Sequence, residues 1–156
     1  MNKLPKIKDK HLKIEIGCGN TKQPGFIGID VRDCGQEIIW DVRGGIPLPD
    51  ESVSEIYSSH VLEHFDNEEL KALFKEFVRV LEPGGKIGAR LPHQLDPSAY
   101  YFDHKTFWNE GRVDTLPGVP GLGCLKVTKN EATNKLNNVG FMELFFELKK
   151  YEKLDK

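Results

Sequence analysis

The chain has 156 residues, of which 38% are hydrophobic and 29% charged, and its formal net charge is -2. This length fits one compact domain that buries about two-thirds of the surface of its unfolded chain. The nearly balanced charge disfavours a dedicated nucleic-acid-binding protein, which needs a strongly positive surface. No segment approaches the ~20 apolar residues of a membrane span or resembles a signal peptide, so we expect neither a membrane-inserted nor a secreted protein.

The cysteines Cys18, Cys34 and Cys124 form no C-x-x-C pair. This odd, sparse set indicates neither a disulfide framework nor a zinc knuckle and is typical of a reducing, cytoplasmic location. The lysine-rich residues 1–11 are expected to form a flexible basic tail, followed by a single domain over residues 12–151.

Three short strands are predicted in the first part of the chain. Residues 12–16 form an apolar strand suited to the centre of a sheet, residues 26–30 form the second, and the apolar run at 38–41 forms the third. Polar residues or glycines follow or end each strand: Gly17, Gly19, Asp30 and Asp41.

The middle of the chain predicts a strand, a helix and a further strand. Residues 53–59 alternate between apolar and polar and predict the fourth strand. The apolar spacing over 70–81 predicts a helix that starts at a capping box made by Asp66 and Glu69. A Pro-Gly-Gly sequence ends this helix, and residues 86–91 predict the fifth strand.

The last third of the chain is less regular. Prolines and glycines in residues 93–125 predict a long loop, and a loop of this length in a compact domain is often functional. A second capping box at Thr128 and Glu131 predicts a helix that ends at Gly140, and residues 141–148 predict the last strand. No strand is evident after that, so a final antiparallel hairpin is not expected.

Strands that alternate with crossovers predict an α/β fold with a doubly wound, mostly parallel sheet. Ligands of such sheets bind beyond the carboxyl ends of the strands, where the strand order reverses. The residues expected to converge there are Glu15, Gly17, Cys18, Gly19, Asp30, Asp41 and His60. Glycines let the backbone approach a ligand closely, and a carboxylate after the second strand can accept hydrogen bonds from both ribose hydroxyls. The pattern therefore predicts a nucleotide-like cofactor.

The spacing of this pattern is unusually short. Only 13 positions separate Gly17 from Asp30, whereas the dinucleotide fingerprint has about 20, because it includes a crossover helix. The helix after the first strand is therefore expected to be nearly absent. The third glycine of the fingerprint is also missing, since Lys22 occupies its position, and this disfavours a nicotinamide or flavin dinucleotide.

Four segments resemble the class I S-adenosylmethionine-dependent methyltransferases, in the order of that family. Residues 15–19, Glu-Ile-Gly-Cys-Gly, resemble motif I, and residues 48–64 resemble the fourth-strand region. Residues 79–86 resemble the turn before the fifth strand, and residues 139–141 resemble the turn before the sixth. The chain is thus similar to a minimal methyltransferase of type 11, which implies a Rossmann-like fold and S-adenosylmethionine as cofactor.

The resemblance implies a cofactor-binding cluster: Glu15, Gly17, Cys18, Gly19, Asp30, Asp41, Val42 and His60. In this scheme the two glycines approach the methionine portion and Asp30 holds the ribose hydroxyls. Asp41 lies by the adenine amino group with a backbone contact from Val42, and His60 lines the methionine end.

The expected activity is methyl transfer to an unknown small-molecule or glycan acceptor. The alternative is a non-catalytic binding module, which the shortened crossover and the absence of a covering N-terminal helix favour, whereas the retained acidic residues favour an enzyme. The loop at 93–125 or a second subunit is expected to close the pocket.

Histidines provide the candidate catalytic groups. His93 and His104 flank an aromatic segment beyond the fifth strand, and either could act as a general base. Equally, the aromatic residues could fill the space of the missing helix while His104 hydrogen-bonds to the loop. Alignment of donor and acceptor can suffice for methyl transfer, so no catalytic residue is obligatory.

A metal-binding motif is also present in the same region. His60 to His64 match the H-x-x-E-H zinc motif, which requires both histidines on one helix. His60 follows a predicted strand, and the predicted helix begins only near Asp66. We therefore expect no metal site from this motif.

Overall fold

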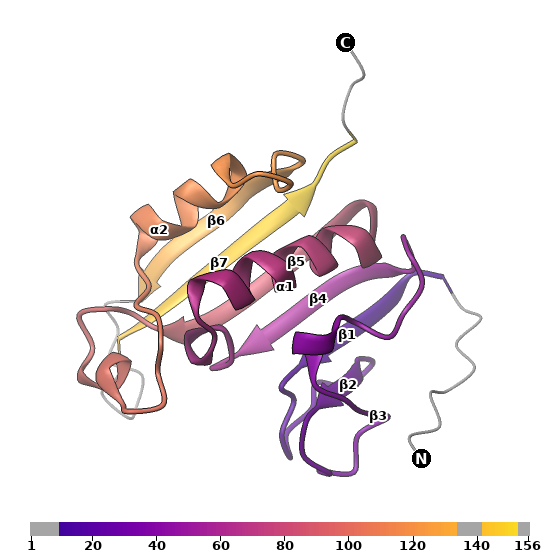
Figure 1. Ribbon diagram of the computed structural model, residues 1–156, viewed down its shortest axis with the longest axis horizontal. Coiled ribbons are helices and arrows are strands. Elements are labelled where there is room, and N and C mark those ends of the chain that lie inside the picture. The colour runs from indigo at the N-terminus through magenta and orange to yellow at the C-terminus, as the bar shows by residue number, and fades with distance from the viewer. Residues whose placement is uncertain (1–9, 134–141, 153–156) are drawn as a thin grey trace.

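The computed structural model describes residues 10–133 and 142–152, which form one seven-stranded sheet with two α-helices (Figure 1). The strands are β1 (Leu12–Ile16), β2 (Ile27–Asp30), β3 (Ile38–Ile39), β4 (Val53–Ser59), β5 (Leu81–Pro92), β6 (Leu125–Thr133) and β7 (Glu143–Lys150). The helices are α1 (Asn67–Val80) and α2 (Glu110–Thr115). Residues 1–9 of the expected tail lie outside the described residues.

The sheet has the order β3-β2-β1-β4-β5-β7-β6. β1 pairs in parallel with both β2 and β4, so the direction of winding reverses between β1 and β4. Within the described sheet, β7 runs opposite to the other strands and pairs antiparallel with β5 and β6. The expected Rossmann-like α/β fold with a mostly parallel sheet is confirmed, and the reversal places the carboxyl ends of β1, β2 and β4 at one edge.

Helix α1 forms where the apolar spacing predicts it. Asp66 accepts hydrogen bonds from the amides of Glu68 and Glu69, and the Glu69 carboxylate accepts one from the Asp66 amide, which completes the predicted capping box. The buried face of α1 carries Leu70, Leu73, Phe74, Phe77 and Val80. Because this apolar stripe matches the helical period, burial against the sheet fixes the orientation of the helix.

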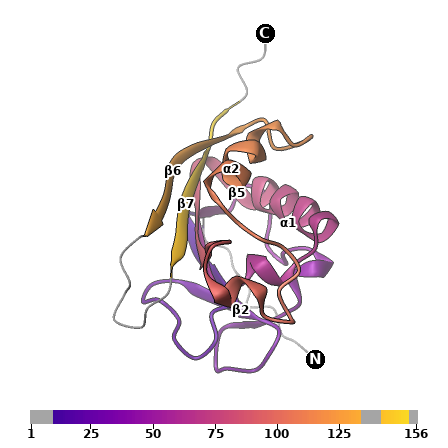
Figure 2. The same cartoon turned by 90° about the vertical axis from the view of Figure 1, so that its left-hand side faces the viewer.

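Both helices lie on the same face of the sheet (Figure 2). Ile14, Ile56 and Ile87 are in register on that face and are fully buried. Adjacent residues in a strand point to opposite faces, and no helix of the described residues covers the second face. The sheet is therefore apolar on one side only.

Charged side chains occupy the face that lacks helices. Lys13 Nζ lies 3.1 Å from Glu55 Oε2, and Lys86 Nζ lies 3.4 Å from Glu55 Oε1. Glu147 of β7 extends the row, 3.6 Å from Lys86 Nζ. We name Lys13, Glu55, Lys86 and Glu147 the charged row. These residues keep this face in water, which is how the sheet forms without the helices of a full doubly wound fold.

The expected loss of the first crossover helix is confirmed: a loop links β1 to β2. A second loop links β2 to β3, which is shorter than predicted because Trp40 and Asp41 leave the sheet. Asp41 instead caps the 3-10 turn Val42–Gly44 by accepting a hydrogen bond from the Arg43 amide.

The predicted fifth strand is longer in the structure than in the sequence prediction. β5 begins at Leu81, which pairs with Val53, and its register against β4 then shifts before Lys86 pairs with Glu55. The Pro-Gly-Gly sequence lies in this irregular stretch, where Gly84 has a φ of 83°. It ends the helix as predicted but produces a distortion within β5 rather than a separate turn.

The helix predicted from Thr128 and Glu131 is wrong over the described residues, which form strand β6. The Thr128 hydroxyl donates to Glu147 of β7 at 2.8 Å instead of capping a helix. Pairing with β7 prevails over the local signal, because a capping pattern also fits an exposed edge strand. The rest of that helix, including Leu136, Val139 and Gly140, lies outside the described residues.

β6 and β7 form the antiparallel pair that the sequence analysis did not expect. The segment predicted as a long loop is also partly ordered: it contains α2 and the 3-10 turns Pro97–Tyr100 and Leu116–Gly118. Trp108 of this segment is 1% exposed and stacks on Phe146 of β7, with 5.7 Å between ring centroids. This contact attaches the segment to the sheet.

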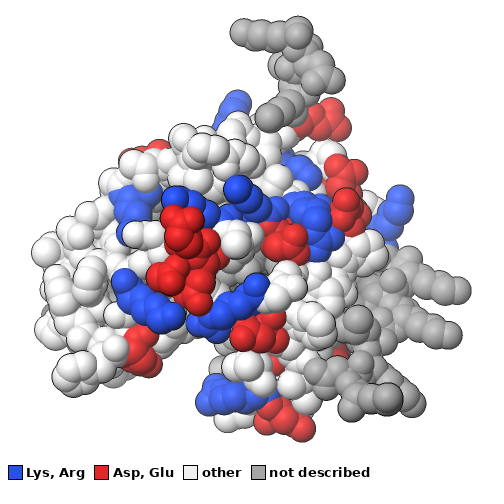
Figure 3. Space-filling model, viewed as in Figure 1, with Lys and Arg blue, Asp and Glu red and all other residues white. Residues whose placement is uncertain are grey.

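The helix-bearing face carries Lys and Arg interspersed with Asp and Glu (Figure 3). Across α1, for example, Glu76 pairs with Arg79 and Lys71 with Glu68. Within the described residues, no helix is both long and apolar enough to cross a membrane.

Candidate functional site

A cavity of about 360 Å³ opens at the carboxyl edge of the sheet, where the winding reverses. Residues from β1, β2, the turn after β3 and the end of β4 line it. Five of the predicted cofactor residues are among them: Gly17, Asp30, Asp41, Val42 and His60. The structure thus brings together residues that are up to 43 positions apart in the sequence.

Asp30 is a polar residue of this cavity whose carboxylate is held by two backbone amides. Its side chain is 6% exposed, and Oδ2 accepts a hydrogen bond from the Gly19 amide at 3.0 Å while Oδ1 accepts one from the Arg32 amide at 2.9 Å. Each carboxylate oxygen has a second lone pair. The carboxylate is therefore held in a fixed orientation and keeps acceptor capacity for a ligand.

Gly17 brings the backbone close to the cavity. Its φ is +65°, a conformation that L-residues with a side chain rarely adopt, and a Cβ at this position would lie 2.3 Å from Val61 Cγ2. The Gly17 amide donates to the Ile29 carbonyl at 2.7 Å, which ties the turn to β2. A side chain at position 17 would thus require both backbone strain and displacement of Val61.

Asp41 and Val42 form another wall of the cavity. Val42 is buried, whereas the Asp41 side chain is half exposed next to Arg43. Arg43 packs over the Phe65 ring at 4.4 Å and donates to Glu69 at 2.8 Å. The hydrogen bond to Glu69 raises the pKa of Arg43, despite its partial desolvation.

Three predicted residues do not line the cavity: Gly19, whose amide donates to Asp30, and the buried residues Glu15 and Cys18. Glu15 is 5% exposed and accepts a hydrogen bond from the Gln23 amide at 2.6 Å. Cys18 is buried, and burial raises the pKa of its thiol to about 11, with further contributions from Asp30 and Glu15. Glu15 and Cys18 support the loop between β1 and β2 from inside.

His60 lies between this cavity and a second one. Its Nε2 is 2.9 Å from Glu143 Oε1, and its Nδ1 is 3.5 Å from Glu63 Oε1. The two carboxylates, Glu63 foremost, raise the pKa of His60 in spite of its partial burial. The second cavity has a volume of about 280 Å³ and shares His60 and His64 with the first.

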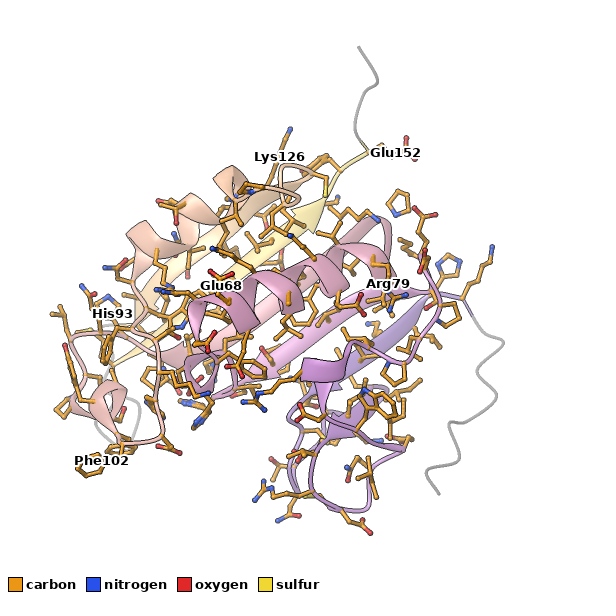
Figure 4. All side chains as sticks on the ribbon, viewed as in Figure 1. Glu68, Arg79, His93, Phe102, Lys126 and Glu152 are labelled. Atoms are coloured by element: carbon orange, nitrogen blue, oxygen red, sulfur yellow. The ribbon has the colours of Figure 1, made fainter. Side chains whose placement is uncertain are left out.

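The loop after β5 forms the outer wall of the second cavity. Asp96 anchors this loop to β7 by accepting a hydrogen bond from the Met142 amide at 2.6 Å. The amides of Lys105 and Thr106 donate to the Glu63 carbonyl at 2.7 and 3.2 Å. The intervening residues Tyr101 and His104 line the cavity, whereas Phe102 projects away from the body of the molecule (Figure 4).

The two candidate histidines differ in their surroundings. His93 is 5% exposed and lines neither cavity. Its Nδ1 accepts from the Leu95 amide at 3.1 Å, which leaves the proton on Nε2, 3.0 Å from Glu110 Oε2. His104 lines the second cavity, and its Nδ1 is buried without a hydrogen-bond partner. Only His104 is placed to meet a ligand.

Sequence reasoning missed several lining residues, among them Val61, Trp40 and Phe65. Val61 directly follows the predicted site residue His60, and Trp40 directly precedes Asp41. Their position beside predicted site residues was the signal that could have identified them. Phe65 follows the 3-10 turn Leu62–His64, which no sequence pattern predicted.

Comparisons with known proteins find methyltransferases that are similar to this chain. A family model described as a methyltransferase domain matches residues 33–89. No curated protein matches the chain. A solved S-adenosylmethionine-dependent methyltransferase from Archaeoglobus fulgidus is 18% identical, with 90% of this chain and 86% of that chain covered at a TM-score of 0.68.

Two further solved structures have the same fold. A methyltransferase from Methanosarcina mazei is 14% identical, with 94% of this chain and 95% of that chain covered at a TM-score of 0.72. The 1,6-didemethyltoxoflavin-N1-methyltransferase of Burkholderia thailandensis was solved with bound 1,6-didemethyltoxoflavin and S-adenosylhomocysteine. It is 10% identical, with 92% of this chain and 72% of that chain covered at a TM-score of 0.68. By its fold and by the match over residues 33–89, the chain is similar to the S-adenosylmethionine-dependent methyltransferases.

Proposed function

We propose that the chain binds S-adenosylmethionine in the 360 Å³ cavity and transfers its methyl group to a small-molecule or glycan acceptor in the adjoining cavity. The observation that carries this proposal is the placement of Asp30. Its buried carboxylate is fixed by two backbone amides at the reversal point of the sheet, where a ribose would be held.

The residues of the first cavity fit this cofactor. Its volume lies within the range of ordinary small-molecule sites. Asp30 keeps lone pairs for two hydroxyl groups, and Gly17 leaves the backbone open where a side chain would collide with Val61. Val42, with its neighbour Trp40, offers an apolar wall to a base, and Asp41 lies beside it at the rim. Glu15 and Cys18 act indirectly, by supporting the loop.

S-adenosylmethionine supplies an electrophilic methyl group when bound. The protein's part is to hold the acceptor in line with it and to exclude water, because alignment contributes most to such a transfer. His60 and His64 line both cavities, so the two cavities are adjacent and an acceptor in the second would lie next to the first. Of the two candidate histidines, His104 would contact such an acceptor. His93 instead stabilises the loop through its hydrogen bonds with Glu110 and the Leu95 amide.

The size and lining of the second cavity support a small acceptor. Its 280 Å³ accommodates a small molecule or one sugar unit, and Ser98, Tyr101 and Glu143 provide hydrogen-bonding groups. The Burkholderia enzyme of the same fold was solved with a small-molecule substrate. Closure of the first cavity by a second subunit stays a prediction. Light scattering with and without S-adenosylhomocysteine would measure the oligomeric state that tests it.

Calorimetry with S-adenosylhomocysteine tests the proposal without knowledge of the acceptor. We expect saturable binding to the full chain and a roughly tenfold to hundredfold weaker affinity for Asp30→Asn, because a charge-assisted contact is lost. Asp33→Asn is the matched control. Asp33 lies in the loop that follows Asp30 and accepts a hydrogen bond from the Gly35 amide at 3.1 Å, but it does not line the cavity.

Absence of heat and of a thermal shift at millimolar ligand would overturn the proposal and leave the alternative of a non-catalytic module. Equal losses in the two aspartate variants would show that the ribose is held elsewhere. If binding is found, transfer of a labelled methyl group to fractionated metabolites or oligosaccharides then identifies the acceptor.

A further inference from the structure

A buried carboxylate that lacks a hydrogen-bond partner among the described residues lines the second cavity. Glu63 is 1% exposed, and neither of its carboxylate oxygens has a hydrogen-bond partner among the described residues. Its closest cation candidate is His60, whose Nδ1 is 3.5 Å from Oε1, too far for a well-formed hydrogen bond. Burial of such a group without compensation is costly, so a buried charge is normally paired or bound to a metal.

His64 follows Glu63 in the chain, and one nitrogen of its imidazole has no partner among the described residues. Its Nδ1 is 3.2 Å from the Asp103 carbonyl and 3.4 Å from an Asp103 carboxylate oxygen. A carbonyl only accepts hydrogen bonds, so Nδ1 carries the proton and Nε2 keeps its lone pair. A histidine oriented in this way by a carboxylate or carbonyl is typical of metal ligands.

His104 supplies the third group. Its Nδ1 is buried and has no hydrogen-bond partner, and its ring meets that of His64 edge to face at 4.8 Å between centroids. The loop that carries His104 is tied to Glu63 itself, since the Lys105 and Thr106 amides both donate to the Glu63 carbonyl. Backbone hydrogen bonds therefore hold the loop of His104 beside Glu63 and His64.

We propose that Glu63, His64 and His104 form a binding site for a divalent transition-metal ion of the zinc class. One ligand atom from each residue lies within 4.8 Å of the ligand atoms of the other two. Two imidazoles and one carboxylate are a ligand set that zinc uses in sites with an open position. All three residues line the second cavity, which gives a water or an acceptor atom access to that position.

This site differs from the H-x-x-E-H motif in the sequence. That motif would place His60 and His64 on one helix, but only the 3-10 turn Leu62–His64 forms, and His60 has a φ of 55° and contacts Glu143. His104, distant in sequence, takes the place of His60. The proposal does not rest on the proposed methyl transfer, because metal binding is measured without cofactor or acceptor.

Equilibrium dialysis of the full chain against zinc, followed by metal analysis, tests the site. We expect one zinc per chain and loss of measurable binding in Glu63→Gln and in His104→Gln. Asp103→Ala, which removes the carboxylate beside His64, should weaken binding by roughly tenfold to a hundredfold. His11→Gln is the matched control, because His11 is exposed and pairs with Glu82, remote from the cavity.

Cobalt substitution provides a second measurement. Tetrahedral or five-coordinate cobalt gives visible absorption bands, and nitrogen and oxygen ligation gives no thiolate charge-transfer band, which separates this site from binding by the three cysteines. Circular dichroism of Glu63→Gln, a nearly isosteric change, verifies that a loss of binding is not a loss of fold.

Three outcomes would overturn the proposal: no zinc bound by the parent chain, zinc retained by Glu63→Gln or His104→Gln, or a thiolate band in the cobalt spectrum. Loss of zinc in His60→Gln with retention in His104→Gln would assign the metal to the H-x-x-E-H pair instead. Cofactor calorimetry is unaffected by these results, so failure of the metal site and failure of cofactor binding are distinguishable.

Discussion

Gly17 and Val61 both line the 360 Å³ cavity and lie so close together that a Cβ on Gly17 would lie 2.3 Å from Val61 Cγ2. Gly19, two residues later, also has a positive φ, but a Cβ there would meet nothing within 4 Å. The two glycines therefore separate two effects. At position 19 a side chain causes only backbone strain, whereas at position 17 it also causes a steric clash.

The first prediction compares alanine at these two positions. Gly19→Ala should lower the free energy of unfolding by about 1 to 2 kcal/mol through backbone strain. Gly17→Ala should lower it by an additional ~1 to 3 kcal/mol, because Val61 must move. Urea unfolding measures the free energy of unfolding of both variants. Adding Val61→Ala to Gly17→Ala should recover part of the additional loss that the clash with Val61 causes. Equal effects at the two glycines would contradict the contact.

The second prediction concerns Glu15. Burial raises the pKa of Glu15, although the hydrogen bond from the Gln23 amide and the charge of Lys22 oppose this. The folded chain then holds the proton more tightly than the unfolded chain, so the free energy of unfolding should decrease as pH rises from the ordinary carboxyl pKa through the raised value. Glu15→Gln should remove this part of the slope and keep an acceptor for Gln23.

Urea unfolding at a series of pH values measures the difference between the parent chain and Glu15→Gln, in which other titrating groups cancel. Glu15→Ala is the comparison: it leaves the Gln23 amide without its partner and should cost about 1 to 3 kcal/mol. Identical pH slopes for the parent chain and the glutamine variant would refute the assignment.

The third prediction concerns the start of α1. Asp66→Ala should lower the free energy of unfolding by about 1 kcal/mol, because two amides of the first turn lose their acceptor. Glu68→Ala is the control. Its side chain is 82% exposed and pairs only with Lys71, so a change below about 0.5 kcal/mol is expected.

Glu69 adds a pH dependence to this helix start. Its pKa is lowered to about 2, first by the hydrogen bond from the Asp66 amide and then by Arg43. A lowered folded pKa means that the stabilisation is present above the ordinary carboxyl pKa and is lost as pH falls toward 2. Glu69→Gln should therefore reduce the acid sensitivity of unfolding, as followed by circular dichroism; an unchanged acid transition would argue against it.

The fourth prediction concerns the charged row. Glu55→Lys replaces two ion pairs by three adjacent lysines, counting Lys13 and Lys86. We expect a lower midpoint of thermal unfolding at low salt and a partial recovery at high salt, because screening weakens the repulsion of exposed charges. Glu55→Gln should have a small effect, since exposed ion pairs contribute about 0 to 1 kcal/mol each. A salt-independent loss in Glu55→Lys would point to packing rather than charge.

The parts of the fold that the sequence predicted are those with local signals. β4 and α1 show their strand or helix period directly, and β1 is a short apolar run. Gly17 follows β1 and Asp30 ends β2, so their convergence follows from parallel pairing. Their role in cofactor binding is still a prediction. The short spacing between these two residues also predicted the missing crossover helix, because no helix of ordinary length fits between them.

The parts that could not be predicted depend on distant contacts. β6 was expected to be a helix because Thr128 and Glu131 fit a capping box, and only pairing with β7 decides the outcome. Likewise, His93 resembled a catalytic base because nothing local reveals that Glu110 and the Leu95 amide occupy its nitrogens. The grouping of Glu63 with His104 could not be predicted either, because the two residues are distant in the sequence and only the fold brings them together.

The charged row also bears on how the strands find their alignment. A slip of two residues between β1 and β4 keeps every apolar side chain on the helix face, so the hydrophobic pattern alone does not forbid it. Such a slip would separate Glu55 from Lys13, which face each other only in the observed register. The face that never touches a helix thus helps to select one register among those that the core would accept.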